Sequence, residues 1–164
     1  MDLQLADVRN YLEQMRIPLR LSCATESGWP MILSLWYLYE EGALLCATRE
    51  TAKIVSFLKR DPRCAFEISG ETPPYSGIRG QATASILPER GGEVLARLLV
   101  RYLGDTDKPL ARRLLAHSDS EVAIKIEPVN LFTWDFTKRM KDSVSGLAAQ
   151  SVTISHALEK GASS

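Results

Sequence analysis

The chain contains 164 residues, of which 45% are hydrophobic and 24% charged, a composition typical of one soluble domain with its own core. Its 20 lysine and arginine residues balance its 20 aspartate and glutamate residues, so the charge does not indicate a nucleic-acid or acidic-membrane partner. No apolar segment approaches the ~20 residues that span a bilayer. These features predict a cytoplasmic protein that binds neither nucleic acid nor membrane.

The first 15 residues predict an amphipathic helix rather than a signal peptide. Asp2, Asp7 and Glu13 are distributed through this segment, whereas a signal peptide has a continuous apolar centre. Val8 and Leu12 recur at helical spacing, so they would give this helix one apolar face.

Runs of apolar residues, most of them alternating with polar ones, predict the strands of a sheet. The expected strands cover residues 17–25, 31–39, 43–47, 64–68, 76–87 and 121–127, and residues 129–134 are expected to continue the last of them past Pro128. Residues 31–39 differ from the others because they are apolar on both faces except at Ser34, which predicts a strand in the middle of the sheet. A turn at residues 40–42 would join this strand in a hairpin to residues 43–47.

Two further helices are expected after residue 87. Pro88 can open a helix, and Gly104 follows its last apolar residue, where glycine commonly ends helices. Asp107 is expected to cap a shorter helix that extends through His117.

The order of these elements predicts a mainly β fold with helices. Short connections between successive strands favour antiparallel pairing, and the absence of a glycine-rich βαβ fingerprint argues against a Rossmann fold. We therefore expect a six-stranded antiparallel barrel, closed or partly closed, with helices packed at its ends. A single domain would cover residues 1–140, followed by a C-terminal tail over 141–164 that is at best partly ordered.

The cysteines and histidines do not form a recognisable catalytic or metal-binding pattern. Cys23, Cys46 and Cys64 lie within expected strands at spacings that match no paired metal-ligand motif, which favours buried free thiols and no metal site. His117 and His156 lie far apart, and neither has a serine or cysteine elbow motif nearby. A nucleophilic triad is therefore not expected.

The strongest indication of a ligand is in residues 43–68, which predict a strand, a polar turn, a short helix and a second strand. An Asp-Pro pair at 61–62 ends the helix, because the residue before proline is disfavoured in helical conformation. Thr48, Thr51 and Lys53 surround the amides that open the helix, and such amides bind phosphate well. The same pattern also fits a capped helix with a solvated lysine, so the local sequence leaves both interpretations open.

Four longer segments of the chain match the segments of one known family in the same order, and the Thr…Lys…Asp-Pro-Arg element is the most specific of the matches. The four segments are LSCATESGWPMILSLWYLYEEGALLCAT, TRETAKIVSFLKRDPRCAF, SGIRGQATASIL and EPVNLFTWDFTKRM, and they extend from about Ile17 to Met140. In these segments the chain resembles the flavin-binding split-barrel family related to pyridoxamine 5′-phosphate oxidase. The resemblance implies a six-stranded split β-barrel and a homodimer with two FMN molecules in grooves between the subunits.

The same resemblance implies roles for individual residues. Thr48, Thr51 and Lys53 match positions that bind the flavin phosphate. Ser34 and Trp36 match positions beside the flavin ring, whereas Arg79 and Trp134 lie on segments that line the groove, often from the partner chain. Each of these groove assignments has a structural alternative. Trp36 and Trp134 would be equally well explained as core or interface residues, and Arg79 would be equally well explained as a solvated strand residue. No catalytic side chain is identified.

Two departures from the family bear on the reaction. Pyridoxamine phosphate oxidases end in an arginine–leucine–histidine–aspartate–arginine stretch that helps hold the substrate, whereas residues 138–142 here are KRMKD. Tyr75 stands about where those enzymes have a glutamine. Vitamin B6 oxidation is therefore not the expected activity.

The sequence thus leaves three hypotheses for function. The first is an FMN-dependent oxidoreductase with an unidentified small-molecule substrate, in which the flavin carries the electrons. The second replaces FMN with a deazaflavin cofactor or haem, although both histidines lie outside the strand core. The third is a dimer that binds flavin for storage or sensing without catalysis.

Overall fold

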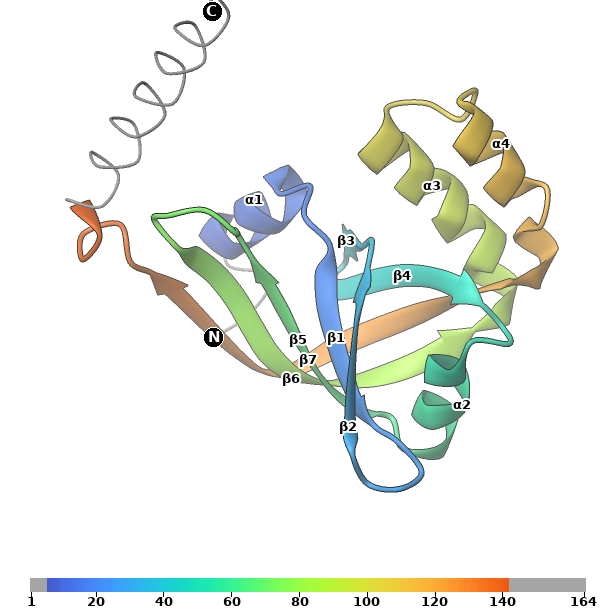
Figure 1. The fold of residues 1–164 in the computed structure, drawn as a ribbon, viewed down its shortest axis with the longest axis horizontal. Helices are drawn as coiled ribbons and strands as arrows, with labels where there is room; N and C mark the ends of the chain where they lie inside the picture. Colours follow the sequence, from blue (N-terminus) through green and yellow to red (C-terminus); the bar gives the residue numbers. More distant parts are fainter. Residues whose placement is uncertain (1–5, 142–164) are drawn as a thin grey trace, which may run out of the picture. The chain divides into compact units, whose positions relative to one another are not determined.

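The computed structural model describes residues 6–141 (Figure 1). These residues divide into two compact units. Within the described chain, the first unit comprises residues 6–68 and 78–132, and the second comprises 69–77 and 133–141. Apart from residue 141, the tail expected over 141–164 lies outside the described residues, as does His156. Among the described helices, none is long and apolar enough to cross a membrane.

The strands form one mainly antiparallel sheet. In chain order the elements are α1 (Ala6–Gln14), β1 (Leu19–Ala24), β2 (Pro30–Leu35), β3 (Leu38–Glu40), β4 (Ala43–Arg49), α2 (Lys53–Arg60), β5 (Arg63–Ser69), β6 (Ser76–Leu87), the 3₁₀ helix η1 (Pro88–Arg90), α3 (Gly91–Leu103), α4 (Pro109–Leu115), the 3₁₀ helix η2 (Ser118–Ser120) and β7 (Glu121–Asp135). The sheet order is β2-β1-β5-β6-β7-β4-β3. This arrangement confirms the split β-barrel with helices around it, with seven described strands instead of the expected six.

The additional strand arises because the expected strand 31–39 is divided. β2 pairs with β1 at one end of the sheet order, whereas β3 pairs with β4 at the other end. Between them, the Trp36 ring stacks on Tyr102 of α3 with a centroid distance of 4.9 Å, and Tyr37 is fully buried. The prediction of one central strand was therefore wrong: the segment is apolar on both faces because it crosses between two packing environments.

The start of α4 also differs from the prediction. Asp107 does not cap this helix, which begins at Pro109 and has no side-chain cap. The carboxylate of Asp105 instead accepts hydrogen bonds from the amides of Asp107 at 3.0 Å and Lys108 at 3.2 Å. Asp105 therefore stabilises the turn before α4, because its side chain can bond amides two and three residues ahead.

The core follows the alternation of the strands. Leu21, Phe66 and Ala82 point into the main hydrophobic cluster, while their sequence neighbours point outward. A second cluster fills the space between α3 and the sheet and includes Leu45 and Leu98. Burial on both faces of β4 explains its continuous apolar sequence.

The three cysteines are free and buried, as the sequence predicted. Burial raises the pKa of the Cys64 thiol to about 12, and it raises the pKa values of the Cys23 and Cys46 thiols as well. These thiols are therefore protonated at neutral pH and behave as small apolar core residues.

The carboxyl end of α1 is held by side chains from elsewhere in the first unit. Arg101 of α3 donates through Nη2 to the carbonyls of Leu12 and Met15, each at 2.7 Å, and through Nη1 to that of Glu13 at 3.0 Å. The Tyr37 hydroxyl donates to the Leu12 carbonyl at 3.0 Å. Since the last carbonyls of a helix have no partner within it, these contacts supply the missing hydrogen bonds. We refer to this group, formed by Arg101, Tyr37 and the three carbonyls, as the α1 clamp.

Candidate functional site

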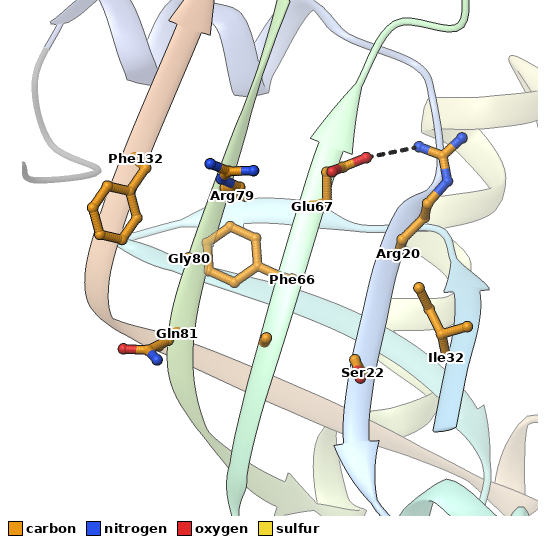
Figure 2. A pocket seen from close by; sticks show the side chains of 10 residues that line it. Arg20, Ser22, Ile32, Phe66, Glu67, Arg79, Gly80, Gln81 and Phe132 are labelled. Carbon is orange, nitrogen blue, oxygen red and sulfur yellow. Dashed lines mark ion pairs between the residues drawn. The ribbon is translucent and has the colours of Figure 1, made fainter. Parts of the chain in front are cut away.

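Outward-facing side chains from five strands line a pocket of about 430 Å³, all of it within the first unit (Figure 2). The lining residues are Arg20, Ser22, Ile32, Ala65, Phe66, Glu67, Arg79, Gly80, Gln81 and Phe132. They belong to β1, β2, β5, β6 and β7. We refer to this space as the outward pocket, because most of its residues lie on the side of the sheet opposite the main core.

A glycine forms part of the pocket floor. A Cβ atom at Gly80 would lie 2.4 Å from the Asn130 carbonyl oxygen and 2.9 Å from Cε1 of Phe66. Only the absence of a side chain therefore permits β6 to approach the β7 backbone and the Phe66 ring this closely. Figure 2 shows the Phe66 ring beside Gly80, so an aromatic surface reaches the pocket from the core.

The polar groups of the pocket are fixed by contacts across the sheet. Arg20 Nη1 lies 3.5 Å from Glu67 Oε1, and the Asn130 side-chain amide donates to Gln81 Oε1 at 3.0 Å. Arg79 is exposed and projects from β6 between the neighbouring strands (Figure 2). The pocket therefore contains two guanidinium groups and one carboxylate, a net positive set of charges.

The apolar side chains of the pocket are exposed to an unusual degree. Ile32 is 68% exposed and Phe132 is 57% exposed, although both lie on strands. Large apolar residues at outward strand positions indicate a surface that another molecule covers. Together with the guanidinium groups, they suit a flat aromatic ligand that carries polar or anionic atoms at its edge.

The junction of β4 and α2 places three predicted phosphate-binding residues close together in sequence and in the fold. Helix α2 begins at Lys53, and its N-cap residue Ala52 has an extended backbone without a side-chain cap. The side chains of Thr48, Thr51 and Lys53 make no hydrogen bond or ion pair with any described residue. The start of α2 therefore presents free amides, two hydroxyls and an ammonium group, a donor set that suits a phosphate.

The Asp-Pro-Arg segment after α2 has a structural role. Arg63 donates through Nη2 to Asp61 Oδ2 at 2.7 Å and through Nε to Oδ1 at 2.9 Å, which holds the pKa of the Asp61 carboxyl at about 2. Arg60 donates to the carbonyls of Ala24 at 3.2 Å and Thr25 at 2.6 Å, at the end of β1. The contacts of Arg60 fix the end of α2 against the β1–β2 turn, and so they also position the opposite end of the helix.

The remaining predicted residues occupy different environments. Ser34 lies on the outward face of β2, opposite Arg20 in the β1–β2 register, so it borders the outward pocket that Arg79 lines. Trp36 packs on α3, as a core residue does, and its role beside a flavin ring stays a prediction. Trp134 belongs to the second unit, and its ring packs directly on Gly77. A Cβ atom added at Gly77 would lie only 2.5 Å from Cζ2 of Trp134.

Sequence reasoning missed most of the residues that line the outward pocket. Arg20, Glu67 and Gln81 are polar residues in alternating strands, a pattern that describes any solvent-facing position. Ile32 could have been recognised from the sequence, because it is an apolar residue at an outward position of β2. Phe132 could have been recognised for the same reason, because it is apolar at an exposed position of β7.

Several solved structures share this fold at low sequence identity. A conserved hypothetical protein from Mycobacterium tuberculosis is 21% identical, with a TM-score of 0.67 over 79% of this chain and 83% of that protein. An F420 reductase is 18% identical, with a TM-score of 0.64 over 75% of this chain and 94% of that protein. A candidate pyridoxamine 5′-phosphate oxidase from Listeria innocua is 18% identical, with a TM-score of 0.60 over 77% of this chain and 94% of that protein.

These comparisons confirm the fold that the sequence resemblance implied: the chain has the split barrel of pyridoxamine 5′-phosphate oxidase-like proteins. No family model matches the chain, and no curated protein matches its sequence.

Proposed function

We propose that this split-barrel protein binds FMN and acts as a small oxidoreductase. The observation that supports this most directly is the uncapped start of α2, where Thr48, Thr51 and Lys53 have no described partners. A phosphate at this position would gain the positive end of the helix dipole, one ammonium group and two hydroxyls. Phosphate binding at a strand–helix junction is also what the sequence resemblance implied for these three residues.

The outward pocket fits the ring of a flavin in size and chemistry. Its volume of about 430 Å³ lies within the range of small-molecule sites. Ile32 and Phe132 can contact the faces of an aromatic ring, while Arg20 and Arg79 offer donors to polar atoms at its edge. When bound, a flavin supplies hydride and electron transfer. The protein would then anchor the phosphate, orient the ring and limit the access of water.

A homodimer forms part of this proposal. Ile32 and Phe132 of the outward pocket are both more than half exposed within the first unit. A second copy of the chain on the outward face would cover these residues and convert the outward pocket into a groove between subunits. We expect a dimer in sedimentation equilibrium at micromolar concentration. Phe132→Arg should shift the protein towards monomer, and a wild-type monomer would contradict the dimer.

A flavin titration of the purified protein tests the phosphate site. Lys53→Ala should weaken FMN binding at least about tenfold, because it removes a charge-assisted contact. Its affinity for riboflavin, which has no phosphate, should be unchanged. The control is Lys59→Ala, which removes an exposed lysine from the last turn of the same helix. Equal FMN binding by wild type and Lys53→Ala would reject the phosphate assignment.

Two alternatives from the sequence can be tested with the same protein. A deazaflavin cofactor would bind through similar contacts, so competitive titration against FMN distinguishes the two. Haem is less well supported, because the histidine within the described residues, His117, follows α4 and lines neither the outward pocket nor the α2 junction.

A non-catalytic flavin-binding dimer would hold FMN that neither NADH nor NADPH reduces, whereas steady-state turnover would exclude it.

A further inference from the structure

A second pocket lies where the residues after α1 meet β3 and α3. Its volume is about 430 Å³, and it shares no lining residue with the outward pocket. The lining residues, all in the first unit, are Arg16, Leu38, Ala96, Arg97, Val100, Arg101 and Thr106. We refer to this space as the arginine pocket. The arginine pocket combines three guanidinium groups with aliphatic side chains. This combination suits an anion that also has an apolar part.

Carboxylates neutralise only one of these guanidinium groups within the described part of the chain. Arg97 Nη1 lies 2.5 Å from Glu40 Oε2 and 2.8 Å from Glu93 Oε1. Arg16 and Arg101 contact main-chain carbonyls and form no ion pair with any described residue. Two positive charges at the arginine pocket are therefore without a carboxylate partner.

The carboxyl end of α1 holds both of these arginines in place. Arg16 Nη1 donates to the carbonyls of Glu13 at 2.6 Å and Gln14 at 3.2 Å, so its Nε and Nη2 groups have no acceptor among residues 6–141. Arg101 belongs to the α1 clamp, and its buried Nε likewise has no acceptor there. Guanidinium groups fixed in this way lose little conformational freedom when a ligand arrives.

Aliphatic side chains form the other part of the arginine pocket. Val100 is 52% exposed on α3, although the helix buries its neighbour Leu99 completely. Leu38 and Ala96 lie beside it in the lining. A hydrocarbon chain in this position would remove the exposed surface of Val100 from water, which is favourable.

We propose that the arginine pocket binds a monocarboxylate that carries a hydrocarbon chain, such as a medium-chain fatty acid. The carboxylate would accept hydrogen bonds from Nε and Nη2 of Arg16 beside the positive charge of Arg101, and the chain would lie against Val100 and Leu38. A single negative charge matches this site better than a phosphate dianion, because Arg101 already uses both of its Nη groups on carbonyls. This site is independent of the proposed flavin site.

Isothermal titration of the full-length protein with octanoate tests this proposal, with 1-octanol as the neutral ligand of equal chain length. We expect saturable binding of one octanoate per chain and at least about tenfold weaker binding of octanol. Arg16→Gln removes a charge and Val100→Asp introduces a repulsive one, so each should weaken octanoate binding about tenfold or more. Both positions are solvent-exposed, and circular dichroism verifies that the variants are folded.

The matched control is Arg112→Gln, which removes an exposed arginine from α4 that does not line the arginine pocket. Its affinity for octanoate should equal that of the wild type. Three results would overturn the proposal: no saturable octanoate binding in the low millimolar range, equal affinity for octanol, or unchanged affinity in both folded pocket variants. The last result would place the bound octanoate elsewhere on the protein.

Discussion

The α1 clamp and the outward pocket use arginine in opposite ways. In the clamp, Arg101 lies over the rings of Tyr37 at 5.2 Å and Tyr102 at 5.7 Å and donates to three carbonyls. In the outward pocket, Arg79 is exposed and Arg20 pairs with Glu67 at the surface. The first arrangement fixes the charged group inside the fold, whereas the second holds it at the surface of the sheet. The type of residue alone therefore does not distinguish a structural arginine from a binding one.

The largest effect that separates the two regions should come from Arg101→Ala. Its loss would remove three charge-assisted hydrogen bonds, and the carbonyls of Leu12, Glu13 and Met15 would keep only their bonds from Tyr37 and Arg16. We therefore expect a decrease of about 3 kcal/mol in the free energy of unfolding. Urea denaturation followed by circular dichroism measures this change. The control, Arg79→Ala in the outward pocket, should change stability by less than about 0.5 kcal/mol. Similar losses in the two variants would remove the distinction between the regions.

A smaller effect is expected from Gly80→Ala on the floor of the outward pocket. The new methyl group would meet the Asn130 carbonyl at 2.4 Å, which forces β6 and β7 apart. We expect a loss of about 1–3 kcal/mol in unfolding free energy together with weaker FMN binding, measured by urea denaturation and flavin titration. Gly70→Ala is the control, because no atom lies within 4 Å of a Cβ there. A fully stable Gly80→Ala protein would show that the pocket floor tolerates displacement.

The smallest effect is the loss of stability at acidic pH, which tests the ion pairs between β3 and α3. Arg90 and Arg97 lower the pKa of the Glu93 carboxyl to about 2, and Arg97 and Arg90 also lower that of Glu40. Since both pKa values are lower in the folded state, this stabilisation is present above about pH 4.5 and is lost as the pH falls towards 2.

The urea midpoint of the wild type should therefore decrease between pH 5 and pH 3, and Arg97→Gln should reduce this dependence modestly, because both carboxylates are partly exposed to solvent. An unchanged pH dependence in Arg97→Gln would show that the ion pairs contribute no measurable stability.

The sequence predicted the strands well wherever one face was apolar and the other polar. Residues 76–87 were predicted with the bounds of β6, and residues 129–134 did continue β7 past Pro128. Residues 31–39 were predicted incorrectly, because alternation cannot reveal that a chain changes its pairing partner at Trp36 and Tyr37. That change depends on packing against α3 and α1, which lie far away in the sequence.

The candidate site was predictable only in part, for a similar reason. Thr48, Thr51 and Lys53 are consecutive features of one turn, so a local pattern could group them. The outward pocket assembles single residues from five strands, and no local pattern connects Arg20 with Arg79. Such a group becomes visible only when the order of the strands in the sheet is known.

The pairing of β4 with β7 has a consequence for how the protein is made. Leu44 pairs with Ile126, so one long edge of β4 has no partner until residues 121–135 have left the ribosome. Until then, the β3–β4 hairpin exposes unpaired backbone groups beside a continuous apolar sequence, a combination that promotes aggregation. Contacts between residues so distant in the chain also slow folding. The nascent chain is therefore most vulnerable during the synthesis of α3 and α4, when it is long enough to expose this edge and too short to cover it.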